Sequence, residues 1–89
     1  MTDLVAIIRA TRRSANALDS MSHFARIASD AAAVIARNYS RVDAGLLKPE
    51  VAEIGNRIAR AQYDHAMKAH KRACGTFARA QDILERNPL

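Results

Sequence analysis

The sequence predicts an all-α protein in which two long antiparallel helices form a hairpin with an alanine-rich seam. Nineteen of the 89 residues are alanine, the strongest helix former. Neither Gly nor Pro occurs between Thr2 and Asp43. In the second half of the chain, alanine recurs every seven residues, at Ala52, Ala59, Ala66, Ala73 and Ala80. Small side chains at one seam position let two helices approach closely. We therefore expect a single helical-hairpin domain over residues 1–89.

The first helix is predicted over about residues 3–43. Asp3 is placed to cap it by accepting a hydrogen bond from a free backbone N–H group. Residues that are mostly apolar follow at steps of three, four or seven, the spacing that keeps one helix face continuous. We expect this face to pack against the second helix. Its members are Leu4, Ile7, Thr11, Leu18, Met21, Ala25, Ala28, Ala32, Ile35, Tyr39 and Val42.

A turn is predicted over residues 44–48 and a second helix over about 49–86. Gly45 suits the left-handed position that follows a helix end, and Pro49 suits the first position of a new helix. The predicted apolar face of this second helix is flanked by Phe77 and Leu84. It consists of Val51, Ile54, Ile58, Ala61, Ala69, Ala73, Thr76, Ala80 and Ile83.

A short turn forces the two helices to run antiparallel, which suggests a register across the hairpin. If residues whose numbers sum to about 94 lie level, large side chains meet small ones, such as Tyr39 beside Gly55. The same register brings opposite charges together near both ends of the hairpin. The predicted ion pairs are Arg9 with Glu85, Arg12 with Asp82, and Arg41 with Glu53.

A two-helix hairpin buries only one stripe on each helix, so we expect it to need a cover. The simplest cover is a second copy of the chain, giving a homodimeric four-helix bundle. The candidates for this oligomer interface are the apolar residues at the edges of the predicted seam: Phe24, Ile27, Val34, Phe77 and Leu84.

Catalytic chemistry is not predicted. Cys74 has His70 one turn before it, but no pocket is implied, and a small, partly buried cysteine is the favoured interpretation. His65 diverges from this pair on a helix, so we predict no metal site and no cofactor. The single cysteine fits a reducing cytoplasm, and no segment is long and apolar enough for a signal peptide or a bilayer span.

The charge balance of +5 favours an anionic partner. The candidate partner-binding residues are Arg26, Lys68, Lys71, Arg72, Arg37 and Arg41. We expect a small interaction protein that binds and regulates or inhibits a protein of acidic surface character. Its small size, single fold element and lack of catalytic motifs resemble those of many small accessory proteins of phages and mobile elements. The alternative is nonspecific nucleic-acid binding by the basic band. A plain solvated face and a small-ligand site between protomers are the remaining alternatives.

Overall fold

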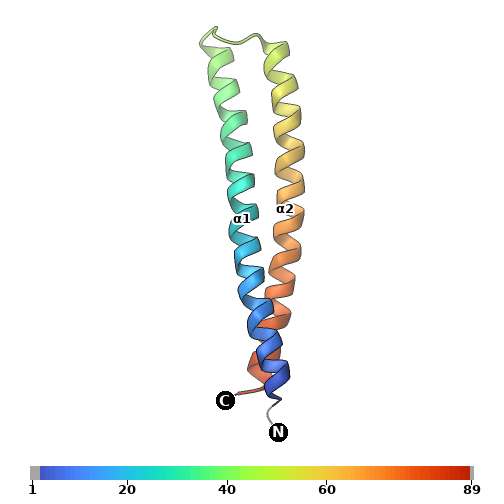
Figure 1. The fold of residues 1–89 in the computed structure, drawn as a ribbon. Helices are drawn as coiled ribbons and strands as arrows, with labels where there is room; N and C mark the ends of the chain where they lie inside the picture. The colour runs from blue at the N-terminus through green and yellow to red at the C-terminus, as the bar shows by residue number, and fades with distance from the viewer. Residues whose placement is uncertain (1–2, 89) are drawn as a thin grey trace.

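Two long helices joined by a short turn make up the structure, a computed structural model that describes residues 3–88 (Figure 1). Helix α1 spans Leu4–Asp43 and helix α2 spans Pro49–Arg86. The helices lie side by side and antiparallel, in a rod of 67 × 16 × 13 Å. The predicted all-α helical hairpin is therefore confirmed, and its helices begin and end within one residue of the predicted positions.

Local sequence signals define the ends of the helices as expected. The side chain of Asp3 accepts a hydrogen bond from the backbone N–H of Ala6 over 3.1 Å. At the turn, Gly45 has a φ of 73°, and its N–H donates to the carbonyl of Val42. The N–H of Leu46 donates to the carbonyl of Arg41 over 2.8 Å. These two bonds form a Schellman motif, which satisfies carbonyl groups left free at the end of α1.

The seam between the helices is built from alanine. All five members of the predicted ladder on α2 are buried, and Ala66 is 0% exposed. Helix α1 contributes Ala10, Ala17, Ala28 and Ala31 to the same seam. Every buried apolar residue in the described part of the chain is an alanine, and no large side chain is fully buried there. The hairpin is thus closely packed, but it lacks the core of large apolar side chains that usually dominates folding stability.

Two polar contacts across the seam establish its register. Asn38 Nδ2 donates to Asn56 Oδ1 over 3.0 Å, and Gln81 Nε2 donates to Ser14 Oγ over 2.8 Å. Both contacts agree with the predicted register to within one residue. The longitudinal alignment of the hairpin is therefore the one that the sequence predicts.

The rotation of the helices about their own axes differs from the prediction. The seam of α1 is centred on the positions of Ala10, Ala17 and Ala31, so Leu4, Leu18 and Tyr39 are about half exposed or more. On α2, the expected seam residues Val51, Ile54 and Ile58 are likewise exposed. The apolar arc of each helix is wider than one helix contact, and the alanines occupy the part of the arc that allows the closest approach.

This rotation also removes the predicted cross-helix pairs. Glu53 pairs with Arg57, and Asp82 pairs with Arg86, both one turn apart within α2. These are the two ion pairs found among the described residues, so the predicted pairs of Arg9, Arg12 and Arg41 are wrong. Asn38, rather than Tyr39, lies against Gly55, with its Nδ2 atom 3.1 Å from the place of an added Cβ.

Candidate functional site

The two sides of the seam differ in chemistry. In each helix, residues seven apart lie on the same side of the seam. The residues that line the hollows along the seam therefore show on which side most other residues lie. One side carries no Lys, Arg, Asp or Glu over most of its length, and its central hollow is lined by Ala25, Ala28, Ser29, Ala32, Tyr63, Met67 and His70. The other side is rich in arginine, and its hollows are lined by Ile27, Asp30, Ala31, Val34, Gln62 and His65 and by Arg13, Thr76, Arg79, Ala80 and Ile83.

An open groove of about 700 Å³ lies on α2, on the outer edge of the arginine-rich side. We call it the basic groove, and it is lined by Lys68, Lys71, Arg72, Gly75, Thr76 and Arg79. Four of these residues lie at steps of four, three and four, which place them in one stripe along a helix. A second hollow shares Thr76 and Arg79 with the groove and adds Arg13 from α1. The cationic surface therefore reaches across both helices.

At the Arg79 end of the groove, the side chains are held in place by contacts with one another and with the backbone. Arg79 Nη2 donates to Thr76 Oγ1 over 3.3 Å, and Thr76 Oγ1 donates to the carbonyl of Arg72 over 3.2 Å. A Cβ added to Gly75 would lie 3.4 Å from Arg79 Nη1, so the guanidinium lies across the glycine. The missing side chain at Gly75 gives Arg79 the room to lie along the helix.

No cation of the groove forms an ion pair with an acidic side chain in the described residues, and the nearest acids along α2, Asp64 and Asp82, lie one turn beyond its two ends. Helix α2 has no Asp or Glu between Asp64 and Asp82. Within the described part of the chain, the two ion pairs involve Arg57 and Arg86, which lie outside the groove. Like charges held close together without counter-charges attract anions, so an anionic group is the ligand that this surface favours.

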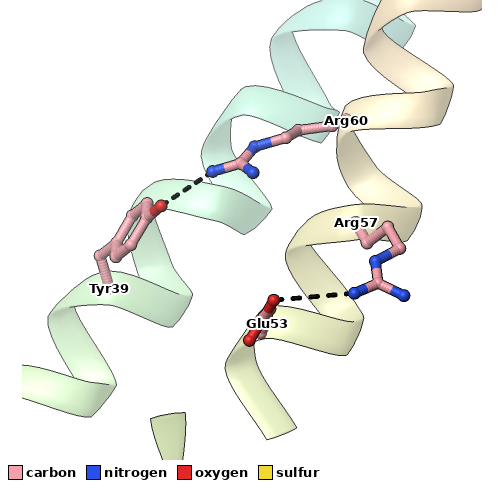
Figure 2. A network of polar contacts seen from close by, with 4 residues as sticks. All are labelled: Tyr39, Glu53, Arg57 and Arg60. Atoms are coloured by element: carbon pink, nitrogen blue, oxygen red, sulfur yellow. Dashed lines mark hydrogen bonds and ion pairs between the residues drawn. The ribbon is translucent and has the colours of Figure 1, made fainter. Parts of the chain in front are cut away.

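Figure 2 shows the polar contacts of two other basic residues, near the turn end of the hairpin. There, Arg60 Nη2 donates to the hydroxyl of Tyr39 across the hairpin over 2.9 Å, and Arg57 pairs with Glu53 at 3.6 Å. Arg57 and Arg60 therefore already bind a carboxylate and a hydroxyl of the protein, whereas among the described residues no cation lining the basic groove is paired with a carboxylate.

The structure brings together only part of the predicted partner-binding set. Lys68, Lys71 and Arg72 all line the basic groove. Arg26, Arg37 and Arg41 are exposed on α1 and do not line it. The prediction missed Arg79 and Gly75, although their helical spacing from Arg72 is visible in the sequence. Arg13 was missed because its position beside Arg79 depends on the rotation of α1.

The predicted oligomer-interface residues do not form one patch. Ile27 and Val34 line a hollow on the arginine-rich side. Phe77 and Leu84 lie seven and fourteen residues after His70, on the opposite side of the seam. Phe24 is half-buried at a seam position, seven residues from both Ala17 and Ala31. A single partner surface cannot cover all five of these side chains.

The residues weighed for catalysis or metal binding are spread along α2. Cys74 Sγ lies 3.6 Å from His70 Nδ1, and both residues are half-buried. His65 lies on the other side of the seam. Among residues 3–88, no group of three or more His, Cys, Asp or Glu side chains is arranged to hold a metal ion. In the same range, neither helix has a stretch apolar enough to cross a bilayer.

Comparison of the chain with protein family models, with curated proteins and with solved structures finds no significant match. The candidate functional surfaces are therefore the basic groove and the side of the seam that has few charged residues.

Proposed function

We propose that this protein is a non-enzymatic interaction protein that binds and regulates or inhibits a partner protein of acidic surface character. The observation that carries the proposal is the basic groove, where Lys68, Lys71, Arg72 and Arg79 lie together and none of them forms an ion pair with an acidic side chain of the described residues. We further propose that the protein acts as a homodimer and in the cytoplasm, where a lone cysteine such as Cys74 stays reduced.

The chemistry of the groove suits carboxylate side chains on a protein surface. Long Lys and Arg side chains offer methylene stems to apolar atoms while their charged ends remain available to acids. Arginine also binds carboxylates through two parallel hydrogen bonds, and Arg72 and Arg79 lie two turns apart on one stripe. An acidic helix or loop laid along α2 could therefore contact several of these cations at once.

Nucleic acid is the second candidate, because unpaired cations in a row also suit phosphates. The stripe from Lys68 to Arg79 covers about 16 Å along the helix, enough for several phosphates of one strand. However, the residues that line the groove include no aromatic side chain on which a base could stack. Binding would therefore be independent of sequence and sensitive to salt.

Affinity capture from host cells tests the first proposal. The bait is the full chain, as wild type, as the Arg72→Glu/Arg79→Glu variant and as the Arg57→Glu control outside the groove. We expect a partner that is retained by the wild type and the control and lost by the groove variant. Reconstitution of the purified pair should then show weaker binding as salt rises. A partner retained equally by all three baits would overturn the proposal.

Titration with a 30-base-pair DNA and a single-stranded RNA, at about 50 and 200 mM salt, tests the second candidate. Submicromolar binding that weakens at least 100-fold with salt, and that the Arg72→Glu/Arg79→Glu variant loses, would favour nucleic acid. Absence of binding even at the lower salt would exclude it.

A further inference from the structure

The charged residues of α1 are confined to one arc of the helix. From Leu4 to Val42, four of the seven positions of the heptad contain no Lys, Arg, Asp or Glu. Two of these four positions, represented by Ala10 and Ile7, pack against α2. The other two, represented by Leu18 and Ser22, are exposed beside the seam. The charge-free arc of α1 is therefore about twice as wide as its contact with α2 requires.

Helix α2 continues this surface. From Tyr63 to Leu84, the two α2 positions on the same side of the seam contain no Lys, Arg, Asp or Glu either. Tyr63 and Met67 are 39% and 41% exposed there, and Leu18 of α1 is 48% exposed. We call this surface the charge-free face. Its members on α1 are Leu4, Ile8, Thr11, Ala15, Leu18, Ser22, Ala25, Ser29, Ala32, Ala36 and Tyr39, and those on α2 are Tyr63, Met67, His70, Cys74, Phe77, Gln81 and Leu84.

We propose that the charge-free face binds a second copy of this chain in antiparallel orientation, with α1 against α1 and α2 against α2. This proposal deepens the proposed function, because it rests on the homodimer and assigns its interface and geometry. The proposed interface therefore excludes Ile27 and Val34, two of the residues predicted from the sequence, because they lie on the arginine-rich side. It leaves the basic groove of each copy exposed.

The inner part of the ladder along the middle of the α1 surface, from Thr11 to Ala32, is complementary to itself. A two-fold axis between Met21 and Ser22 places Leu18 opposite Ala25 of the second copy, so a large side chain meets a small one. The same axis places Thr11 opposite Ala32 of the second copy. Such pairing of large with small side chains lets facing helices interdigitate. Because no charge lies on this part of α1, the antiparallel arrangement brings no like charges together there.

The size of the face also suits a dimer. The ladder from Leu4 to Tyr39 runs for about 53 Å at 1.5 Å per residue. On α2 the face runs only from Tyr63 to Leu84, about 32 Å. If each helix provides half of the 16 Å width of the rod, the two parts give roughly 670 Å², within the range of about 600–1,000 Å² that each partner buries in a standard interface. The seam itself buries only alanine among its apolar residues, so a second copy would supply the large apolar contacts that the hairpin lacks.

The native cysteine provides a direct test of this geometry. The hairpin register places Cys74 level with Met21, and Cys74 lies seven residues after the exposed Met67. The proposed two-fold axis therefore passes close to Cys74 as well as to Ser22. The two copies of Cys74 would face each other between α2 and its counterpart. A disulfide forms readily only when the Cα atoms approach to about 4.4–6.8 Å.

The experiment is oxidation of the purified, dilute full chain with diamide, which accepts the two protons and two electrons released when two thiols join. We expect the wild type to become a disulfide-linked dimer, and Cys74→Ser to remain unlinked. In the Cys74→Ser background, Ser22→Cys should restore the link, because Ser22 lies beside the same axis. Ala61→Cys is the matched control, since it is an exposed position of α2 outside the charge-free face.

Light scattering on the reduced wild type should give twice the chain mass of 9.8 kDa. A monomer at about 50 μM would overturn the proposal, as would cross-linking through Ala61→Cys as fast as through Cys74. A dimer that cross-links through Val34→Cys but not through Cys74 would place the second copy on the wrong face and equally overturn it. These measurements use the purified chain alone, so their failure is separable from loss of an acidic partner, which the groove variants report.

Discussion

Asn38 and Asn56 are hydrogen-bonded to each other across the hairpin, near the turn end of a seam that is otherwise largely alanine. Asn38 Nδ2 donates to Asn56 Oδ1 over 3.0 Å, and Asn56 is only 4% exposed. In the described part of the chain, no buried side-chain nitrogen or oxygen lacks a partner. An alanine ladder could slide by one heptad with little change in packing. A buried polar pair penalises such a slip, because the slip would leave both amides without partners.

The first prediction concerns this pair. Asn56→Ala should lower the free energy of unfolding by about 1–3 kcal/mol, because it leaves the part-buried amide of Asn38 without its acceptor. The double variant Asn38→Ala/Asn56→Ala should lose less than the sum of the single variants. Urea unfolding followed by circular dichroism measures both values. The control is Tyr39→Phe, which removes an exposed hydrogen bond to Arg60 and should cost under about 0.5 kcal/mol. Equal losses for Asn56→Ala and Tyr39→Phe would contradict a role of the pair in stability.

The second prediction tests the close approach of the helices at Ala66. This residue is 0% exposed, so Ala66→Leu must force the helices apart or its own side chain out of a preferred rotamer. We expect a loss of about 1–3 kcal/mol in unfolding free energy. Ala61→Leu adds the same atoms at an exposed position of α2 and should change stability by less than about 0.5 kcal/mol. If Ala66→Leu left the unfolding free energy unchanged, the seam would have enough space for the larger side chain.

The ends of the helices and their antiparallel direction could be predicted because each depends on a local sequence signal. Asp3, Gly45 and Pro49 mark helix ends through their own backbone and side-chain chemistry, and a short turn leaves only one direction for the return. The buried ladder on α2 could be predicted as well, because an exact seven-residue repeat of small residues has few other uses.

The rotation of each helix about its own axis could not be predicted, because it depends on which stripe of the apolar arc packs more closely against the other helix. Leu18 and Tyr39 are apolar and correctly spaced, yet they lie beside the seam, since the narrower residues Ala17 and Ala31 permit a closer contact. Periodicity identifies an apolar arc, but it does not say which edge of a wide arc faces the other helix. The same error placed Arg9, Arg12 and Arg41 opposite acids that they do not meet.

The basic groove shows the same limit. Lys68, Lys71 and Arg72 are close in sequence and could be grouped as one cluster. Arg13 joins them only through the contact between helices, near Arg79. Local clusters of charge are therefore predictable, while the surface that two helices build together requires their relative rotation.

The third prediction concerns Gly45, which ends α1 in a left-handed conformation. An added Cβ there would meet nothing within 4 Å, so the cost of Gly45→Ala comes from the backbone alone. An L-residue at a φ of 73° costs about 1–2 kcal/mol, and we expect that loss of stability in urea unfolding. Gly45→Asn should lose less, because asparagine tolerates this conformation better than alanine. Equal stability of the wild type and Gly45→Ala would indicate that the turn has another conformation.

The fourth prediction compares the two glycines inside α2. Replacing a helical glycine by alanine usually stabilises a helix by about 1 kcal/mol, and Gly75→Ala should show this gain, since its Cβ would lie 3.4 Å from a flexible guanidinium. At Gly55 the new Cβ would lie 3.1 Å from Asn38 Nδ2, the atom that donates to Asn56. Gly55→Ala should therefore gain little or lose stability, because Asn38 can move away only by weakening its hydrogen bond. Urea midpoints of the two variants, measured side by side, provide the test. If Gly55→Ala were as stabilising as Gly75→Ala, the helices would have to be farther apart at Asn38 than the structure places them.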